Sequence, residues 1–167
     1  GPVGLSAVLI GKAFGARVIG VDVIEERVAL ARKIGADEAI NGATEDVVES
    51  IRALTGGEGS DALYEASGSA PGRRQGIQGL RRGGAGVFCG VGTDEETLNL
   101  TEIIGRELTL MGSFVLSLRL TYDLVQFLAD NQLSFDPLVT HTFPIADGEE
   151  AYREADESRT GKVAFTW

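Results

Sequence analysis

The sequence predicts an α/β fold in which a parallel sheet is covered by helices on both faces. Helical and strand-like segments alternate along the chain with short connections, a pattern typical of crossover units that pair parallel strands. The segment 17–22 is a short run rich in β-branched residues, which is typical of a strand buried on both faces. Glycine, with 23 residues, ends most of the apolar runs and therefore indicates tight turns, not low complexity.

The first six elements follow from apolar periodicity and its breaks. A dense apolar run before Gly15 predicts a helix, and the β-branched run that ends in Asp22 predicts a strand. Acidic residues near the start and Gly35 at the end bound the next helix. In order, we expect a helix over 2–14, a strand over 17–22, a helix over 25–34, a strand over 39–41, a helix over 45–55 and a strand over 61–66.

The alternation continues to about residue 114 and then changes. Three glycines weaken the next helix, and Gly83 with Gly84 is expected to end it. Elements are expected in this order: a helix over 71–82, a strand over 85–92, a turn over 101–105 and a strand over 107–114. The tail is expected to hold helices around 120–128 and 148–155 and strands over 139–144 and 161–167. We therefore expect two parts, residues 1–114 and residues 115–167.

Composition excludes several classes of function. The net charge of −10 would repel nucleic acid, and the nearest basic cluster, Arg73, Arg74, Arg81 and Arg82, is expected to form a solvated helix face. No uninterrupted run of about 18 apolar residues indicates a membrane span, and the N-terminus does not read as a signal peptide. The single cysteine, Cys89, excludes an internal disulfide framework. We expect a cytoplasmic protein that binds neither nucleic acid nor membrane.

The run Gly1-Pro2-Val3-Gly4 opens the first helix. A dinucleotide-binding fold needs glycine where a strand turns into a helix, because side chains would keep the pyrophosphate from the N–H groups at the helix terminus. Asp22 ends the following strand 18 residues after Gly4, about where the carboxylate that accepts the ribose hydroxyls belongs. That carboxylate would repel a 2′-phosphate, so NAD is favoured over NADP. The alternative is that Asp22 only caps the helix over 25–34.

Further motifs extend through the whole chain. They are Gly15-Ala16, Gly35-Ala36-Asp37, Glu65-Ala66-Ser67-Gly68, Phe88-Cys89-Gly90-Val91-Gly92, Met111-Gly112-Ser113-Phe114, Pro137-Leu138-Val139-Thr140-His141 and Gly161-Lys162-Val163. Together with the opening turn and Asp22, they resemble the cofactor-binding half of the zinc-dependent medium-chain alcohol dehydrogenases, with the polyol and threonine dehydrogenase branch nearest. The sequence over 115–119 departs from the threonine dehydrogenase pattern, so the substrate stays open.

The resemblance implies two groups of cofactor-binding residues. The group for the pyrophosphate and the adenosine ribose is Gly1, Pro2, Val3, Gly4, Asp22, Arg27 and Lys162. The group that borders the dinucleotide cleft and meets the nicotinamide end is Ala66, Ser67, Cys89, Gly90, Val91, Ser113 and Phe114. The resemblance also implies a homodimer or homotetramer formed through the strand over 108–114.

In the family, a catalytic zinc is held by cysteine, histidine and an acidic residue in an N-terminal domain, and we do not expect ligands or catalytic residues here. His141 and Cys89 are expected to be structural or surface residues. The first strand of a Rossmann-type doubly wound sheet would precede Gly1 and lie between the strands that end at Asp22 and Glu65. We therefore expect a Rossmann-type parallel sheet that lacks its first strand, with a tail belonging to the catalytic domain of a longer enzyme.

The resemblance implies an NAD-dependent oxidoreductase that transfers a hydride between NAD and a small secondary alcohol or polyol. One alternative is a dinucleotide-binding or structural module without catalysis. A zinc-free quinone reductase of the same superfamily is a third possibility, but such enzymes usually prefer NADPH, and Asp22 argues against that preference.

Overall fold

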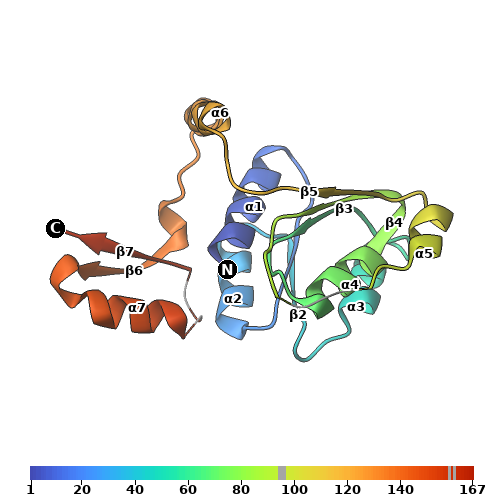
Figure 1. Cartoon of the computed structure of the whole chain (residues 1–167), viewed down its shortest axis with the longest axis horizontal. Coiled ribbons are helices and arrows are strands. Elements are labelled where there is room, and N and C mark those ends of the chain that lie inside the picture. The colour runs from blue at the N-terminus through green and yellow to red at the C-terminus, as the bar shows by residue number, and fades with distance from the viewer. Residues whose placement is uncertain (94–96, 158, 160) are drawn as a thin grey trace. The chain divides into compact units, whose positions relative to one another are not determined.

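The computed structural model describes residues 1–93, 97–157, 159 and 161–167. The chain forms two compact units: the first unit contains residues 1–43 and 115–167, and the second unit contains residues 44–114. Every strand pairing among the described residues is parallel, and helices alternate with strands along most of the chain (Figure 1). The predicted α/β class is therefore confirmed.

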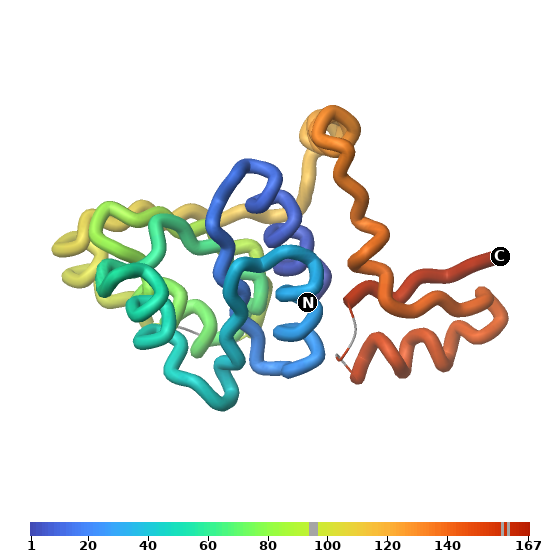
Figure 2. Tube along the Cα trace, turned by 180° about the vertical axis from the view of Figure 1, so that it is seen from behind, coloured from blue at the N-terminus to red at the C-terminus, as the bar shows by residue number. Residues whose placement is uncertain are grey.

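The first unit begins with two helices and two strands. Helix α1 (Pro2–Ala13) is followed by β1 (Ile19–Asp22), α2 (Glu25–Lys33) and β2 (Glu38–Asn41). Its remaining elements are α6 (Leu118–Asp130), the 3₁₀ turn η1 (Asp136–Leu138), β6 (Val139–Pro144), the 3₁₀ turn η2 (Ile145–Asp147), α7 (Gly148–Asp156) and β7 (Lys162–Thr166). Strands β1 and β2 pair, and β6 and β7 run side by side although 17 residues separate them in the sequence (Figure 2).

One apolar core joins both segments of the first unit. Buried side chains from α1, α2 and β2 meet Leu138 of η1, which is only 4% exposed. The buried members are Leu5, Val28, Ala31, Ala39 and Leu138. The ring of Phe127 on α6 stacks on Phe14 with centroids 5.0 Å apart. Burial of these side chains fixes the start of α1 beside the turn that carries Leu138. The predicted division of the chain into a part over 1–114 and a part over 115–167 stays a prediction.

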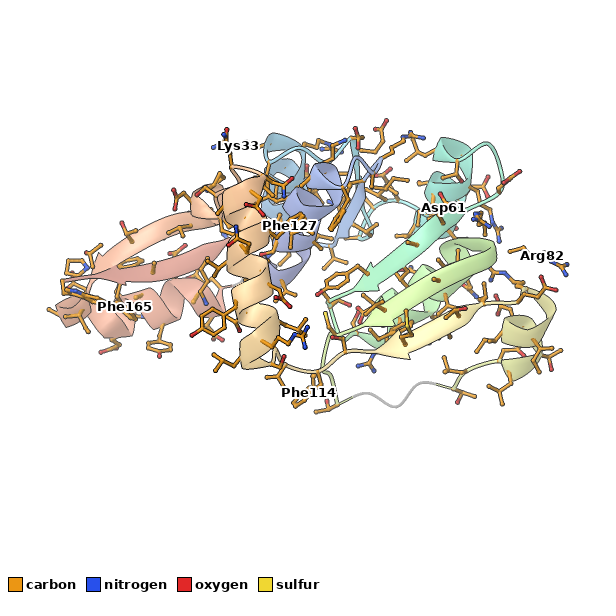
Figure 3. The ribbon with its side chains drawn as sticks, turned by 90° about the horizontal axis from the view of Figure 1, so that it is seen from above. Lys33, Asp61, Arg82, Phe114, Phe127 and Phe165 are labelled. Atoms are coloured by element: carbon orange, nitrogen blue, oxygen red, sulfur yellow. The ribbon has the colours of Figure 1, made fainter. Side chains whose placement is uncertain are left out.

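The second unit is a three-stranded sheet with helices. Its elements are α3 (Val47–Leu54), β3 (Ser60–Glu65), α4 (Ala70–Gly79), β4 (Leu80–Phe88), α5 (Leu100–Gly105) and β5 (Thr109–Gly112). The strands lie in the order β3-β4-β5, and Glu65, Phe88 and Gly112 are in register at their carboxyl ends. Phe114 follows β5 at this end of the sheet, whereas Asp61 and Arg82 lie toward the other end (Figure 3).

Two local expectations in the second unit are wrong. Helix α4 ends at Gly79, and β4 begins at Leu80 because that side chain turns into the core, where it is 2% exposed. Arg81 and Arg82 therefore do not share a helix face with Arg73; they form ion pairs with Asp61 and Glu107. The expected turn over 101–105 is helix α5, which the side chain of Asn99 caps by accepting from the Glu102 N–H.

The pairings agree with the expected strand order. In the doubly wound order 3-2-1-4-5-6, leaving out strand 1 leaves the pair 3-2 and the triplet 4-5-6. The pair corresponds to β1-β2, and the triplet corresponds to β3-β4-β5. Among the described residues, β1 has a ladder only to β2, and the side chain of Val21 is 46% exposed. The expectation that β1 is buried on both faces is therefore wrong for this chain.

Candidate functional site

In the first unit, the N-terminus of α1 offers unpaired backbone donors. Gly1 is the N-cap, and Pro2 occupies the first turn, where its missing N–H costs nothing. The first N–H that closes the helix is that of Leu5, which donates to Gly1 O at 3.0 Å. The first turn holds no acidic side chain. The partial positive charge of the helix terminus is therefore available to an anion.

Asp22 lies beside this helix terminus at the carboxyl end of β1. Its Oδ1 accepts hydrogen bonds from the N–H groups of Val23 (2.8 Å) and Ile24 (3.1 Å). Its Oδ2 lies 3.2 Å from the backbone nitrogen of Gly1. One carboxylate oxygen thus fixes the turn into α2, and the other points to the start of α1.

Arg27 completes this group of charges. Its Nη1 lies 4.0 Å from Asp22 Oδ2, and both side chains are 19% exposed. The Nε of Arg27 is buried and donates no hydrogen bond in the structure. A buried guanidinium N–H without an acceptor is costly. Gly1 adjoins it, because a Cβ there would lie 3.9 Å from the guanidinium.

A pocket of about 300 Å³ lies beside the same helix terminus, wholly within the first unit. Its lining residues are Pro2, Val3, Ser6, Phe135, Leu138, Val139 and Lys162. The walls are mainly apolar, and Lys162 supplies its only charged side chain. Gly4 is open on its outer side, since a Cβ there would meet no atom within 4 Å. The structure thus brings together Pro2, Val3 and Lys162 around this pocket.

The seven candidates of the second unit gather at the carboxyl edge of its sheet. Because β3, β4 and β5 are parallel and end in register, the residues that follow them leave the sheet at one edge. These candidates are Ala66, Ser67, Cys89, Gly90, Val91, Ser113 and Phe114. Val91 and Phe114 are largely exposed. The N–H of Ser113 donates to Phe88 O at 2.9 Å, so the sheet uses that donor.

Two turns at this edge pack backbone against backbone. The N–H groups of Cys89 and Gly90 donate to Glu65 O at 2.9 and 3.1 Å. A Cβ on Gly90 would lie 2.2 Å from Gly68 N, and one on Gly92 would lie 2.0 Å from Gly68 O. Only glycine permits this approach. The turns 66–68 and 89–92 therefore form one rigid surface.

Three side chains at this edge were not among the predicted site residues. Glu65 is buried beneath the turns, and Arg73 donates from Nη2 to Gly90 O at 3.1 Å. A hydrogen bond with the Cys89 thiol, together with burial, raises the pKa of Tyr64 to about 12. The sequence contained a signal that could have identified Glu65, because an acidic residue at the end of a buried strand needs a hydrogen-bonding partner.

The residues that the structure describes do not form a zinc site. The sequence holds one histidine and one cysteine, His141 and Cys89. No group of three or more histidine, cysteine or acidic side chains in the described part of the chain has the arrangement to hold a metal. His141 Nε2 lies 3.8 Å from Glu154 Oε1 on α7.

The fold and the edge geometry define the chain as part of an α/β protein with parallel strands and a glycine-opened helix. Residues 2–130 match the family model described as zinc-binding dehydrogenase. The chain therefore belongs to the zinc-binding dehydrogenase family.

Individual relatives agree with the family model. An L-threonine 3-dehydrogenase of Saccharopolyspora erythraea is 31% identical over 168 residues, which cover 100% of this chain and 49% of the relative. The solved alcohol dehydrogenase of Thermus sp. ATN1 superposes with a TM-score of 0.88 at 29% identity, covering 99% of this chain and 48% of that one. A solved NAD-dependent alcohol dehydrogenase gives a TM-score of 0.83 at 29% identity over 99% of this chain and 48% of its own. The chain spans about half the length of the relatives it matches.

Proposed function

We propose that this chain supplies the cofactor-binding part of an NAD-dependent oxidoreductase that acts on a small secondary alcohol or polyol. The observation that carries the proposal is the cluster at the start of α1, where free helix N–H groups, Asp22 and the unpaired Nε of Arg27 lie together. These groups match an anionic pyrophosphate and an adjacent ribose diol. Family membership and the names of the relatives support the same cofactor and reaction class.

The first unit would hold the adenosine half of the cofactor. The N–H groups at the start of α1 would bind the pyrophosphate, and Lys162 would add its charge from the wall of the pocket. Asp22 Oδ2 would accept from the ribose hydroxyls, and Arg27 would donate to ribose or phosphate oxygens. A 2′-phosphate would meet the Asp22 carboxylate, so the proposal specifies NAD over NADP.

The second unit would hold the nicotinamide half. The turns 66–68 and 89–92 would present backbone to the ring, and the carbonyl of Ser113 with the backbone of Phe114 would address the carboxamide, since the Ser113 N–H is used. When bound, the cofactor accepts or returns a hydride at its nicotinamide ring. No zinc-dependent step is assigned to the residues of this chain.

The proposal also includes the wider organisation. Residues 1–114 would form the NAD-binding domain, and residues 115–167 would return to the catalytic domain. Strand β5 would join copies of the chain in a homodimer or homotetramer, because within the described sheet it pairs only with β4 and leaves Met111 50% exposed. None of the described helices is long and apolar enough to cross a membrane. We place the protein in the cytoplasm, in line with its single cysteine.

Fluorescence titration of the purified protein with NADH and with NADPH tests this function. We expect NADH to bind and NADPH to bind at least about tenfold more weakly, because one charge-assisted contact would be replaced by repulsion. Equal or tighter binding of NADPH would contradict the assignment of Asp22. Binding of neither nucleotide would contradict the proposed function. Binding of NADH by a protein that turns over no secondary alcohol would favour a non-catalytic dinucleotide-binding module.

A further inference from the structure

Glu65 is the only charged residue that is buried in the described part of the chain; it is 4% exposed. It ends β3 in the second unit, directly below the turns 66–68 and 89–92. A buried carboxylate is costly unless hydrogen bonds replace its lost hydration. The bonds that Glu65 accepts therefore show which backbone groups it holds in place.

All of the hydrogen bonds to the Glu65 carboxylate that the structure shows come from the turn 66–68. Glu65 Oε1 accepts from Ser67 N (2.8 Å), Ser67 Oγ (2.5 Å) and Gly68 N (3.0 Å). Glu65 Oε2 lies 3.3 Å from Gly68 N. Two successive N–H groups and one hydroxyl thus converge on a single carboxylate oxygen, which is the arrangement that stabilises a charged acceptor.

A series of hydrogen-bonded hydroxyl groups links the carboxylate to α4. The single proton of the Ser67 hydroxyl is donated to Glu65, so in the 3.0 Å contact between the two hydroxyls Ser69 is the donor. Ser69 Oγ in turn accepts from Gly72 N at 3.1 Å and caps α4. A Cβ on Gly72 would lie 2.5 Å from Ser67 Oγ, so glycine at this position leaves room for the hydrogen-bonded hydroxyl groups.

The second turn packs against the carboxylate and bonds to the backbone of the same residue. A Cβ on Gly90 would lie 2.8 Å from Glu65 Oε2, and Gly90 N donates to the backbone carbonyl of Glu65. Because Gly68 packs against Gly90 and Gly92 without a gap, any movement of 66–68 displaces 89–92. The turn whose N–H groups bind the carboxylate is therefore also the turn that packs against 89–92.

We propose that Glu65 is a positioning residue that fixes the turns 66–68 and 89–92 in the conformation that receives the nicotinamide end of the cofactor. The inference rests on the proposed function. It assigns Glu65 no contact with the cofactor: the carboxylate acts through the backbone of Ser67, Gly68 and Gly90. Its effect is therefore specific to ligands that extend to the second unit.

The test compares the binding of NADH with the binding of AMP, which lacks the nicotinamide end, by titration calorimetry. Glu65→Gln keeps the size of the side chain but removes its charge and places an NH₂ donor near the Gly68 N–H. We expect the Kd for NADH to rise about tenfold or more and the Kd for AMP to change less than about twofold. The matched control is Glu58→Gln, the same change at an exposed position of the second unit, which is expected to leave both Kd values unchanged.

Two further measurements sharpen the result. Amide hydrogen exchange at Ser67 and Gly68 should accelerate in Glu65→Gln, while exchange at the core residues Ile77 and Leu80 should not. Glu65→Asp, which keeps the charge but is one methylene shorter, should restore NADH binding only in part. Unchanged NADH binding in Glu65→Gln, or an equal loss of NADH and AMP binding, would overturn the inference. If the unsubstituted protein binds neither ligand, the proposed function itself fails.

Discussion

The two units prepare their candidate sites by different means. In the first unit, charged side chains do so: Asp22, Arg27 and Lys162 surround the start of α1 or its pocket. In the second unit, the surface is backbone, formed by glycines in close contact over one buried carboxylate. Charged groups suit phosphate and hydroxyl recognition, whereas tightly packed backbone suits a flat ring that must be placed accurately. Substitutions at the candidate site of the first unit should therefore change the affinity for the cofactor. Substitutions at the candidate site of the second unit should change the stability of the fold as well.

The largest expected effect is that of Gly90→Ala. The new methyl group would lie 2.2 Å from Gly68 N, and backbone must move to admit it. We expect a loss of about 3 kcal/mol or more in the free energy of unfolding, the upper range for overpacking. Urea denaturation measures this loss. Gly105→Ala, where a Cβ meets no atom within 4 Å, is the control and should change stability little. Equal stability of both variants would show that the turns do not pack as described.

Asp22→Asn should act on binding. The amide oxygen can keep the bonds from Val23 and Ile24, so the fold should persist. Loss of the charge should weaken NADH binding by about 1.5–3 kcal/mol, or roughly 10- to 100-fold. It should also reduce the preference of the protein for NADH over NADPH. Fluorescence titration with both nucleotides measures this change. If the preference stays the same, Asp22 serves only to hold the turn before α2.

Gly4→Ala separates stability from binding at one residue. A Cβ at this helical position meets nothing, so alanine should leave the protein as stable or raise its unfolding free energy by about 0.5–1 kcal/mol. The same methyl group would stand where a pyrophosphate approaches the helix N–H groups, so NADH should bind more weakly, though less so than Asp22→Asn weakens it. Thermal melts and NADH titrations measure the two effects. A stable variant with unchanged affinity would contradict the pyrophosphate site.

The smallest expected effect concerns acid stability in the first unit. Hydrogen bonds from Lys12, at 2.8 Å, and from the Val18 N–H lower the pKa of Asp37 below its ordinary value of 3.8. Since the folded pKa lies below the unfolded one, the interaction contributes stability above the unfolded pKa and loses it as pH falls through the folded pKa. Asp37→Asn should therefore lower the urea midpoint at about pH 7 and differ less from wild type at about pH 3. If the difference in urea midpoint between Asp37→Asn and wild type grew toward acid pH, the direction assigned to the pKa shift of Asp37 would be contradicted.

Much of the fold was readable from local patterns. The helix over 25–34, the strand over 39–41 and the strand over 139–144 each lie within a residue of the observed element, because periodicity and flanking breaks agree there. Leu80 could not be placed in this way. It follows a glycine-rich helix with no stop signal, and only tertiary burial decides that it begins β4.

The site divides in the same manner. Asp22 could be predicted because its charge and its spacing from Gly4 indicate the chemistry, whereas Lys162 was indicated only by the resemblance to the family. Glu65 is harder to find, because its importance lies in burial and in the two N–H groups that converge on it. The contacts of Gly68 with Gly90 and Gly92 join residues more than 20 positions apart, which no local pattern encodes.

Amide hydrogen exchange of the purified protein with saturating AMP and with saturating NADH tests most directly whether the two units hold the two halves of one cofactor. We predict that AMP slows exchange around residues 3–5 and 22–27 only, and that NADH slows exchange there and also at 66–68, 89–92 and 114. Protection by NADH that is confined to one unit, or an identical pattern with both ligands, would contradict the division of the cofactor between them.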